Sequence, residues 1–287
     1  MNAIAITGAL LEEGIKRLEA GSAKPDAPSA ARLDAEVLLA HVLGAPRARL
    51  RSHPEESAPA AAAERYLRLI ERRASGEPLA YLTGRREFWS LELAVSPAVL
   101  IPRPETELLV ERALAVLATT TGTVVDLGTG CGAIALALAS ERPGWRVLAT
   151  DVSEAALAVA RANAAALGLG RVEFRAGRWF EPLNAERFDL IVSNPPYVAA
   201  GDPVLTRSGL QYEPSLALTP GADALECLRA LAHAAPAHLK SGGWLLLEHA
   251  ADQAQAVRGE LVLAGLRSVR SHRDLAGHER MTEGQRR

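Results

Sequence analysis

The chain has 287 residues, of which 48% are hydrophobic and 23% are charged. This is long for one compact domain and short for three, and the apolar content allows a sizeable core. Lysine and arginine number 32 against 34 aspartates and glutamates, so the formal net charge is −2. The strong basic field that dominates nucleic-acid affinity is absent, which argues against a dedicated DNA-binding protein.

The composition does not indicate a secreted, membrane or metal-binding protein. Two cysteines, Cys131 and Cys227, are too few for a disulfide framework or a four-ligand zinc site, and they indicate a reducing, cytoplasmic setting. The seven histidines are scattered without ligand spacing, so no metal is expected. No basic stretch precedes the first apolar residues, so no signal peptide is predicted. Uncharged runs such as 127–140 stop short of the ~18 residues of a membrane span.

Residues 1–75 are expected to be helical and nothing else, because apolar residues recur there at helical spacing. The first stretch contains Leu10, Leu11, Ile15 and Leu18, and the second contains Leu33, Val37 and Ala40. Gly44 and Pro46 end the second stretch, and a third covers residues 54–74. Basic residues number 11 and acidic residues 10 in this region. We therefore predict a small helical domain, residues 1–76, with a mixed surface.

A linker is predicted at residues 77–100. The run SGEP at 75–78 interrupts the helical pattern, and WSLELAV at 89–95 alternates apolar and polar residues. This alternation places Leu91, Leu93 and Val95 on one side of a strand. The linker is therefore expected to contain a β-hairpin that joins two domains.

From residue 101 to 287 the pattern changes to alternating strands and helices. Apolar runs predict the strands, and Ala-rich stretches predict the helices, one of which is opened by Ser153. The strands are expected at 123–128, 146–152, 171–176, 188–194 and 243–250, and the helices at 133–141 and 153–168. Such units build an α/β fold, a mostly parallel sheet with helices on both faces.

A glycine-rich loop, DLGTGCG at 126–132, lies between the first strand and the first helix of this domain. Gly128, Gly130 and Gly132 allow a close approach to a ligand, although a plain strand–helix turn would also use them. Asp151 ends the next strand, 21 residues after Gly130, and an acid at about this spacing binds ribose hydroxyls. The glycines lack the dinucleotide spacing, and no P-loop lysine follows them. S-adenosylmethionine, an adenosine cofactor without phosphate, fits this pattern best.

The tetrad Asn194-Pro195-Pro196-Tyr197 follows the fourth strand. A turn is the plain interpretation, because proline ends strands and asparagine favours turns. A methyltransferase acting on a planar NH₂ group also needs acceptors that hold both hydrogens and aim the nitrogen at the methyl carbon. The Asn194 side-chain oxygen and the Pro195 carbonyl can do this, Pro196 stiffens the turn, and Tyr197 offers a flat ring. No metal or strong base is required, since the sulfonium is already activated.

Several short motifs spread over most of the chain occur together in one known family. They are YLTG (81–84), LIPRPETE (100–107), DLGTGCGAIALALA (126–139), RWF (178–180), VSNPPYV (192–198), YEPSLAL (212–218), GGWLLLEHA (242–250) and DLAGHER (274–280). With these motifs the chain resembles the PrmC/HemK family, the class I, S-adenosylmethionine-dependent release factor glutamine methyltransferases. The resemblance implies a Rossmann-like, seven-stranded, mostly parallel sheet behind a small helical domain. NPPY alone is shared with adenine-N6 methyltransferases, whereas its combination with PRPETE is more specific.

The resemblance implies methyl transfer to side-chain N5 of the glutamine in the Gly-Gly-Gln motif of bacterial class 1 peptide release factors. The helical domain would dock the release factor, and a monomer is expected. The cofactor would be bound by Gly128, Thr129, Gly130, Cys131, Gly132, Asp151, Trp179 and Asn194, with Trp179 beside the adenine. The catalytic residues would be Asn194, Pro195, Pro196 and Tyr197. Arg178 stands where an acid often precedes this tryptophan in the family, so a carboxylate for the adenine amino group is missing there.

The roles and the substrate have alternatives. Trp179 could be a core residue, and Arg103 and Glu105 could form a salt bridge at a helix start or shape the glutamine pocket. Cys131 is expected to be a small loop residue and not a nucleophile. The chain could instead methylate adenine N6 or guanine N2 of a nucleic acid or a glutamine of a ribosomal protein, or bind a partner without catalysis. A nucleic-acid methyltransferase would need a basic recognition surface, which the composition does not supply.

Overall fold

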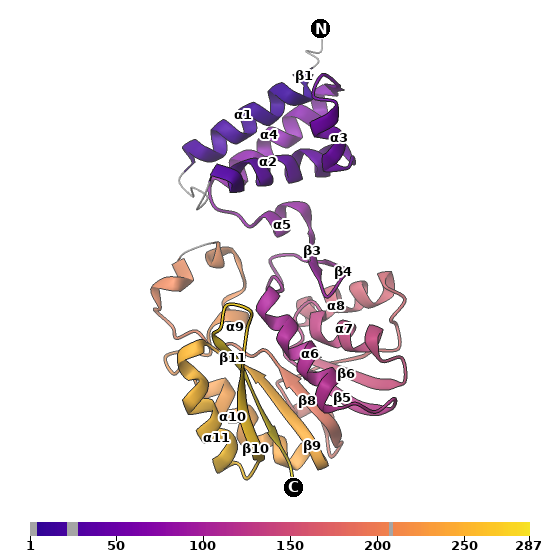
Figure 1. The fold of residues 1–287 in the computed structure, drawn as a ribbon, viewed down its shortest axis with the longest axis vertical. Helices are drawn as coiled ribbons and strands as arrows, with labels where there is room; N and C mark the ends of the chain where they lie inside the picture. Colours follow the sequence, from indigo (N-terminus) through magenta and orange to yellow (C-terminus); the bar gives the residue numbers. More distant parts are fainter. Residues whose placement is uncertain (1–4, 22–27, 207–208) are drawn as a thin grey trace. The chain divides into compact units, whose positions relative to one another are not determined.

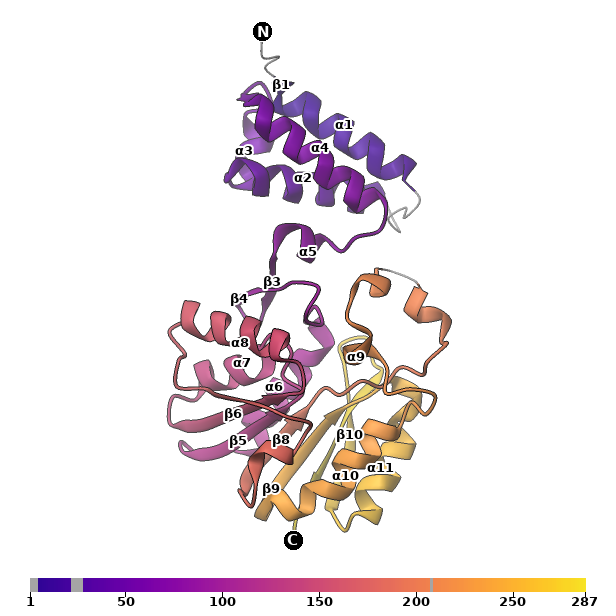
Figure 2. The same ribbon diagram turned by 180° about the vertical axis from the view of Figure 1, so that it is seen from behind.

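The computed structural model describes residues 5–21, 28–206 and 209–287. The chain forms two compact units. The helical unit comprises residues 1–84 together with the segment 206–212, and the sheet unit comprises residues 85–205 and 213–287. Figures 1 and 2 show the elements of each unit from opposite sides.

The helical unit contains α1 (Thr7–Ala20), α2 (Pro28–Leu43), α3 (Arg47–Ser52), α4 (Ala60–Ala74) and α5 (Leu79–Thr83). It also contains a short antiparallel pair, β1 (Ala5–Ile6) with β2 (Ser57–Ala58), so the prediction of helices alone is wrong here. The first amides of a helix have no partner within it. The Thr7 amide therefore donates to the Glu56 carbonyl at 2.8 Å, which draws the segments before α1 and α4 together.

Close packing of α1 against α4 depends on Gly14. A Cβ at this position would clash with the hydroxyl oxygen of Tyr66, a residue that is fully buried. The predicted face of α2 is wrong, because Leu33 is 43% exposed. The apolar residues of α2 that are completely buried are Ala31, Ala35, Leu38 and Leu39. Small alanines allow the neighbouring helices to approach, which the spacing of larger residues does not reveal.

The segment 206–212 belongs to the helical unit although it is distant in sequence. Its 3₁₀ turn, η4 (Leu210–Tyr212), brings the Tyr212 hydroxyl 3.1 Å from the Ser75 carbonyl oxygen, to which it donates. Gly209 has a φ of 80°, and a Cβ there would lie 3.1 Å from the Gly76 carbonyl oxygen. A residue without a side chain is therefore required where this segment meets the end of α4.

The sheet unit is built on seven strands in the order β10-β11-β9-β8-β5-β6-β7. The parallel strands are β5 (Gly122–Leu127), β6 (Trp145–Asp151), β7 (Glu173–Ala176), β8 (Phe188–Ser193) and β9 (Leu239–Glu248). Two antiparallel strands, β10 (Arg267–Arg273) and β11 (Glu279–Gln285), complete one edge. The predicted mostly parallel, seven-stranded sheet is confirmed. The sequence analysis did not locate β10 and β11, which are rich in polar residues.

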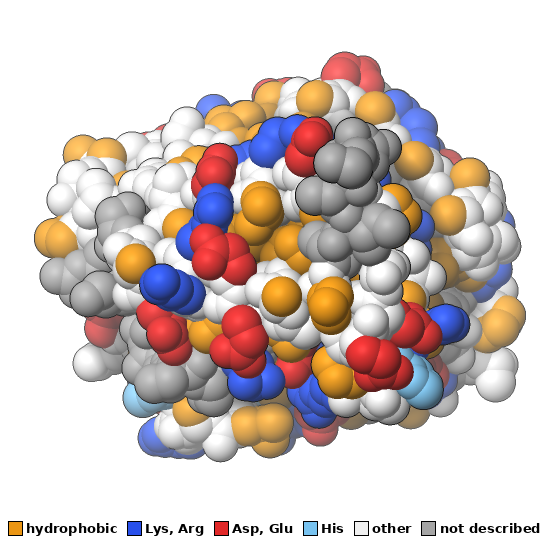
Figure 3. All heavy atoms as spheres, turned by 90° about the horizontal axis from the view of Figure 1, so that it is seen from above, with side chains coloured by type: hydrophobic (Ala, Val, Ile, Leu, Met, Phe, Trp, Pro, Cys, Tyr) orange, Lys and Arg blue, Asp and Glu red, His pale blue; other side chains and the backbone are white. Residues whose placement is uncertain are grey.

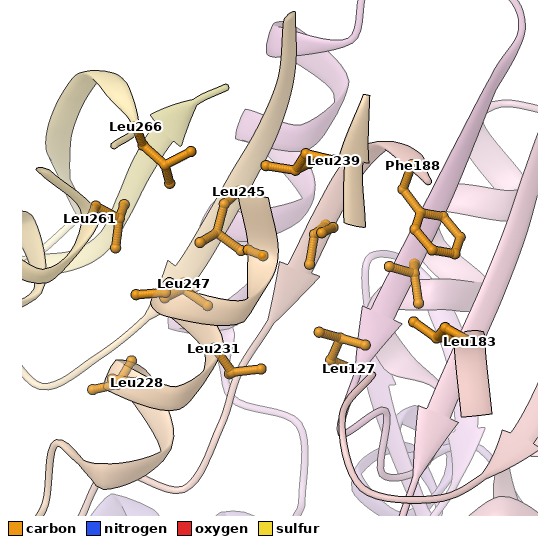
Figure 4. Packing of buried hydrophobic residues seen from close by; sticks show 14 of the residues in the cluster. Leu127, Leu183, Phe188, Leu228, Leu231, Leu239, Leu245, Leu247, Leu261 and Leu266 are labelled. Atoms are coloured by element: carbon orange, nitrogen blue, oxygen red, sulfur yellow. The ribbon is translucent and has the colours of Figure 1, made fainter. Parts of the chain in front are cut away.

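Helices cover both faces of the sheet (Figure 1). On one face lie α6 (Glu107–Val116), α7 (Ala133–Glu141) and α8 (Glu154–Ala166), and on the other lie α10 (Glu226–His238) and α11 (Ala254–Leu263). A short helix, α9 (Ser215–Leu218), precedes α10. Figure 4 shows Leu228 and Leu231 of α10 beside Leu245 and Leu247 of β9, in the core that α10 and α11 form with the sheet. None of the helices in the described ranges is long and apolar enough to cross a membrane.

The linker contains the predicted hairpin, with a different turn. β3 (Arg85–Phe88) pairs with β4 (Leu91–Ala94), so Trp89 and Ser90, predicted as strand, form the turn. Their φ values of 51° and 57° lie in the left-handed region that two-residue hairpin turns require. The Trp89 amide donates to Glu107 Oε1 at 2.9 Å, and its indole Nε1 donates to Glu141 Oε1 at 2.7 Å. These contacts with α6 and α7 hold a non-glycine turn in place.

Candidate functional site

The carboxyl ends of β5, β6, β7 and β8 border one cavity of about 450 Å³ in the sheet unit. Its wall includes the residues that follow these strands, and segments from 98–106 and 214–227 close it. Parallel strands end at the same edge of a sheet, so loops distant in sequence meet there. The volume is typical of a small-molecule site (~300–1,000 Å³).

The glycine loop lines this cavity through Gly128, Thr129, Gly130 and Cys131, whereas Gly132 is not part of its wall. Gly130 has a φ of 57°, and its amide donates to Asp151 Oδ2 at 2.9 Å. Gly128 has a φ of 75°, and a Cβ there would lie 3.0 Å from the Trp179 ring. Both positions therefore require glycine. Cys131 is buried, and burial raises the pKa of its thiol to about 12, which disfavours the thiolate form.

Asp151 ends β6 at the cavity wall. Its carboxylate accepts from the Gly130 amide and, through Oδ1, from the Ser153 amide at 2.9 Å. Burial raises the pKa of Asp151, while these backbone hydrogen bonds oppose the rise. A carboxylate has about four acceptor sites, so two amide bonds leave acceptor capacity for hydroxyl groups of a ligand. Ser153 also caps α8 as predicted, because its hydroxyl accepts from the Ala156 amide at 3.2 Å.

Asp126, near the end of β5, holds the glycine loop in place by hydrogen bonds. The sequence analysis did not assign it a role. Its Oδ2 accepts from the Thr129 hydroxyl at 2.6 Å and from the Ala135 amide at 3.2 Å. Asp126 is completely buried, and its Oδ1 has no hydrogen-bond partner among the described residues. Burial raises the pKa of Asp126 to about 7. The signal that could have revealed it is the single acid that ends an otherwise apolar strand.

Trp179 follows β7 and lines the cavity while its ring also packs against the main core. Its φ of 51° is unusual for a bulky residue. The indole Nε1 is buried without a hydrogen-bond partner in the described part of the chain. The preceding Arg178 lines the same cavity, and its guanidinium lies 3.7 Å from the carboxylate of Glu226 on α10. An acid therefore stands beside Arg178, although the sequence analysis did not connect the two.

The tetrad is divided between the cavity and the protein interior. Asn194 and Pro196 line the cavity, whereas Pro195 and Tyr197 are not part of its wall. The Asn194 side-chain amide donates to the hydroxyl of Thr106 at 3.2 Å. The Tyr197 hydroxyl donates to Glu248 Oε1 at 3.2 Å, and burial raises the pKa of this phenol. The structure therefore places the flat ring of Tyr197 beside the cavity and not on its surface.

The motif PRPETE reaches a distant partner. Arg103 forms an ion pair with Glu213, and Glu213 Oε2 accepts from the Ile101 amide at 3.0 Å. Glu213 is only 6% exposed. The prediction of a local salt bridge at the start of a helix is therefore wrong for Arg103, whose charge is used to hold the segment 213–220 against the cavity mouth.

Comparisons with known proteins agree along the chain. A family model described as the PrmC N-terminal domain matches residues 9–84, and one described as the methyltransferase small domain matches residues 104–207. The release factor glutamine methyltransferase of Xylella fastidiosa strain Temecula1 is 56% identical over 254 residues, which cover 88% of this chain and 92% of that protein. The chain belongs to the release factor glutamine methyltransferase family. The family member from Pseudomonas aeruginosa is 53% identical over 261 residues, 91% of this chain and 94% of that protein.

Solved structures share the fold of this release factor glutamine methyltransferase family member at low identity. The Thermus thermophilus 16S rRNA N2 G1207 methyltransferase, in complex with AdoMet and guanosine, is 20% identical. The match has a TM-score of 0.51 and covers 71% of this chain and 50% of that one. The human Mettl16 catalytic domain is 17% identical with a TM-score of 0.56, and the match covers 80% of this chain and 84% of that one. These likenesses concern the methyltransferase fold alone.

Proposed function

We propose that this chain transfers a methyl group from S-adenosylmethionine to side-chain N5 of the glutamine in the Gly-Gly-Gln motif of class 1 release factors, in the cytoplasm. The observation that carries the proposal is the position of Asn194. Its side chain lies at the end of β8, on the wall of the cavity that also contains the glycine loop and Asp151. A group that can hold an amide is thus next to groups that can hold an adenosine cofactor.

The cavity residues fit S-adenosylmethionine. Asp151 retains acceptor capacity for ribose hydroxyls, and Trp179 Nε1 is a donor without an acceptor among the residues that the structure describes. Val152, an apolar residue that is 54% exposed, follows Asp151 on the wall and offers a surface for the flat adenine. When bound, this cofactor supplies an electrophilic methyl group on a sulfonium. We assign its binding to Gly128, Thr129, Gly130, Cys131, Gly132, Asp151, Trp179 and Asn194.

The tetrad would orient the substrate amide. The lone pair of an amide nitrogen is delocalised, so the nitrogen attacks a methyl carbon only when it is held and aimed. Asn194 Oδ1 and the Pro195 carbonyl would accept one hydrogen each from the glutamine NH₂ group. The two prolines would keep these acceptors rigid, since their φ angles are fixed. Orientation by a pre-organised turn is then the main contribution of the protein.

The helical unit would dock the release factor. Nucleic acid requires a surface of basic side chains that are free to meet phosphates. Several arginines of the helical unit instead pair with acidic side chains, among them Arg17, Arg47, Arg51 and Arg73. On the face seen in Figure 3, basic and acidic side chains are interspersed and neither forms a continuous field. A protein surface of mixed charge is the more suitable partner.

Methylation of a defined acceptor tests the proposal. Tritiated S-adenosylmethionine would be incubated with the full chain and an intact release factor, a ribosomal protein fraction, or DNA and RNA in parallel. We expect label only in the release factor, and none in a release factor whose motif glutamine is replaced by alanine. Label that persists in the alanine variant, or that enters nucleic acid instead, would refute the proposed substrate.

Docking has a separate test. If the helical unit binds the release factor, the intact factor should be methylated with a much lower KM than a short Gly-Gly-Gln peptide. Equal kcat/KM for the peptide and the intact factor would exclude a docking contribution. Calorimetry with S-adenosylmethionine alone reports whether the cofactor site is competent in either case.

A further inference from the structure

Thr106 of the PRPETE motif forms a hydrogen bond with a residue that is distant in the sequence. It ends the 3₁₀ turn η1 (Pro104–Thr106), lines the cavity, and is 4% exposed. Its hydroxyl oxygen accepts a hydrogen bond from Asn194 Nδ2 at 3.2 Å. The two residues are 88 positions apart in the sequence. Thr106 is therefore bonded to the side chain that the proposed reaction uses to hold its substrate.

Glu248 lies behind the same pair. It is the last residue of β9 and is 2% exposed. β8 and β9 are parallel neighbours with Ser193 opposite Leu247, so Asn194 and Glu248 are the next residues along the two strands. Glu248 Oε1 accepts from the Tyr197 hydroxyl at 3.2 Å. Its Oε2 is buried and has no partner at hydrogen-bond distance within the described ranges.

The direction of the bond between Thr106 and Asn194 fixes the orientation of the Asn194 amide. The hydroxyl of Thr106 accepts from Asn194 Nδ2, so the NH₂ group of that side chain faces Thr106. Asn194 Oδ1 is thereby turned away from Thr106 and is available as an acceptor. Glu248, in turn, accepts from the hydroxyl of Tyr197 and so fixes the orientation of that ring.

We propose that Thr106 and Glu248 are positioning residues for methyl transfer, which fix the orientation of the Asn194 amide and of the Tyr197 ring. The inference rests on the proposed function, because the substrate amide is the group that Asn194 Oδ1 would hold. The hydrogen bond also links the PRPETE and NPPY motifs, because Thr106 of the first accepts from Asn194 of the second. Neither Thr106 nor Glu248 has to touch the reacting atoms.

Single-turnover methylation of an intact release factor tests the proposal with three variants. Thr106→Val removes the hydroxyl at nearly constant volume, and the rate should fall at least ~10-fold. The KM for the release factor and the Kd for S-adenosylmethionine should change less than about twofold. Thr106→Ser keeps the hydroxyl and should restore the rate to within about threefold of wild type. Glu248→Leu removes the acceptor of the Tyr197 hydroxyl, and the rate should also fall at least ~10-fold. Thr119→Val, an exposed threonine outside the cavity, is the matched control.

Two results would overturn the proposal. One is a wild-type rate in Thr106→Val, or an equal loss in the serine and valine variants while both bind the cofactor normally. The other is a wild-type rate in Glu248→Leu. A readout without substrate separates this inference from the proposed function. In ¹⁵N spectra the Asn194 side-chain NH₂, assigned by its disappearance in Asn194→Asp, should exchange with water at least ~10-fold faster in Thr106→Val than in wild type. Equal exchange rates would contradict the hydrogen bond even if the acceptor of the methyl group were a different one.

Discussion

Replacing Asp126 by asparagine should stabilise the sheet unit at neutral pH, because the native carboxyl is buried beneath the glycine loop. Burial raises its pKa from 3.8 to about 7, so between these values the folded chain holds a proton that the unfolded chain has released. Wild-type stability therefore falls as pH rises through this window, by about 1.4 kcal/mol per unit and ~4 kcal/mol in total. Asparagine does not titrate, and it keeps one acceptor for Thr129 and Ala135. Weaker hydrogen bonds to a neutral acceptor cost ~1 kcal/mol each, which leaves a net gain of ~2 kcal/mol at pH 8.

Urea unfolding of both proteins at pH 5, 6, 7 and 8, followed by tryptophan fluorescence, measures this difference. All four tryptophans, Trp89, Trp145, Trp179 and Trp244, lie in the sheet unit, so the signal reports this unit alone. The free energy of unfolding of Asp126→Asn relative to wild type should rise by about 1.4 kcal/mol per pH unit between pH 5 and 7 and level off above. A pH-independent difference would refute the argument that the folded state holds Asp126 protonated.

Asp189→Asn is the matched control. Although burial opposes it, hydrogen bonds from Lys240 and Thr123 hold the pKa of Asp189 below its usual value. A carboxylate whose pKa is lowered by folding stabilises the protein above its unfolded-state pKa, and this stabilisation is lost only as pH falls below that value. The free energy of unfolding of this variant should therefore differ from that of wild type by a constant amount between pH 5 and 7. Glu248, whose pKa burial raises to about 7, affects wild type and both variants equally and cancels in the comparison.

Three further predictions concern cofactor, catalysis and packing. Asp151→Ala should weaken S-adenosylmethionine binding by ~1.5–3 kcal/mol in calorimetry, and an unchanged Kd would contradict the ribose assignment. Asn194→Ala should lower the single-turnover methylation rate ~100-fold with little effect on release-factor binding, whereas a wild-type rate would mean that the tetrad is only a turn. Gly14→Ala should destabilise the helical unit by ~1–3 kcal/mol through its clash with Tyr66, measured by hydrogen exchange of that unit. Unchanged hydrogen exchange in Gly14→Ala would contradict the clash.

The sequence predicted the parts of the site that local pattern determines. Apolar runs located β5, β6 and β8, and the residues that follow these strands, including Gly130, Asp151 and Asn194, line one cavity. These residues lie together because parallel strands end at a common edge, so the positions of the strand ends are enough to bring their loops together. No knowledge of side-chain contacts was needed for that step.

Side-chain partners across long sequence distances were not predictable in the same way. Arg103 pairs with Glu213 and not with a neighbour in its own turn. Tyr197 turns its hydroxyl to Glu248, which places its ring outside the cavity wall. In each case the choice of partner depends on which strands are adjacent in the sheet and how deeply each polar group is buried, and neither quantity has a periodic signature. The exposure of Leu33 on α2 was unpredictable for the same reason, because the face of α2 that is buried in the helical unit is the one rich in alanine.

The membership of residues 206–212 in the helical unit affects how this protein can be divided for experiment. The chain passes from one unit to the other three times, after residue 84, before residue 206 and after residue 212. An expression fragment that starts at residue 85 would thus retain a piece of the missing unit, with the Tyr212 hydroxyl deprived of its acceptor on Ser75. A protease cut between α5 and β3 would likewise leave the segment 206–212 on the fragment that begins at residue 85. A clean excision requires two edits: removal of residues 1–84 and replacement of 206–212 by a short polar loop.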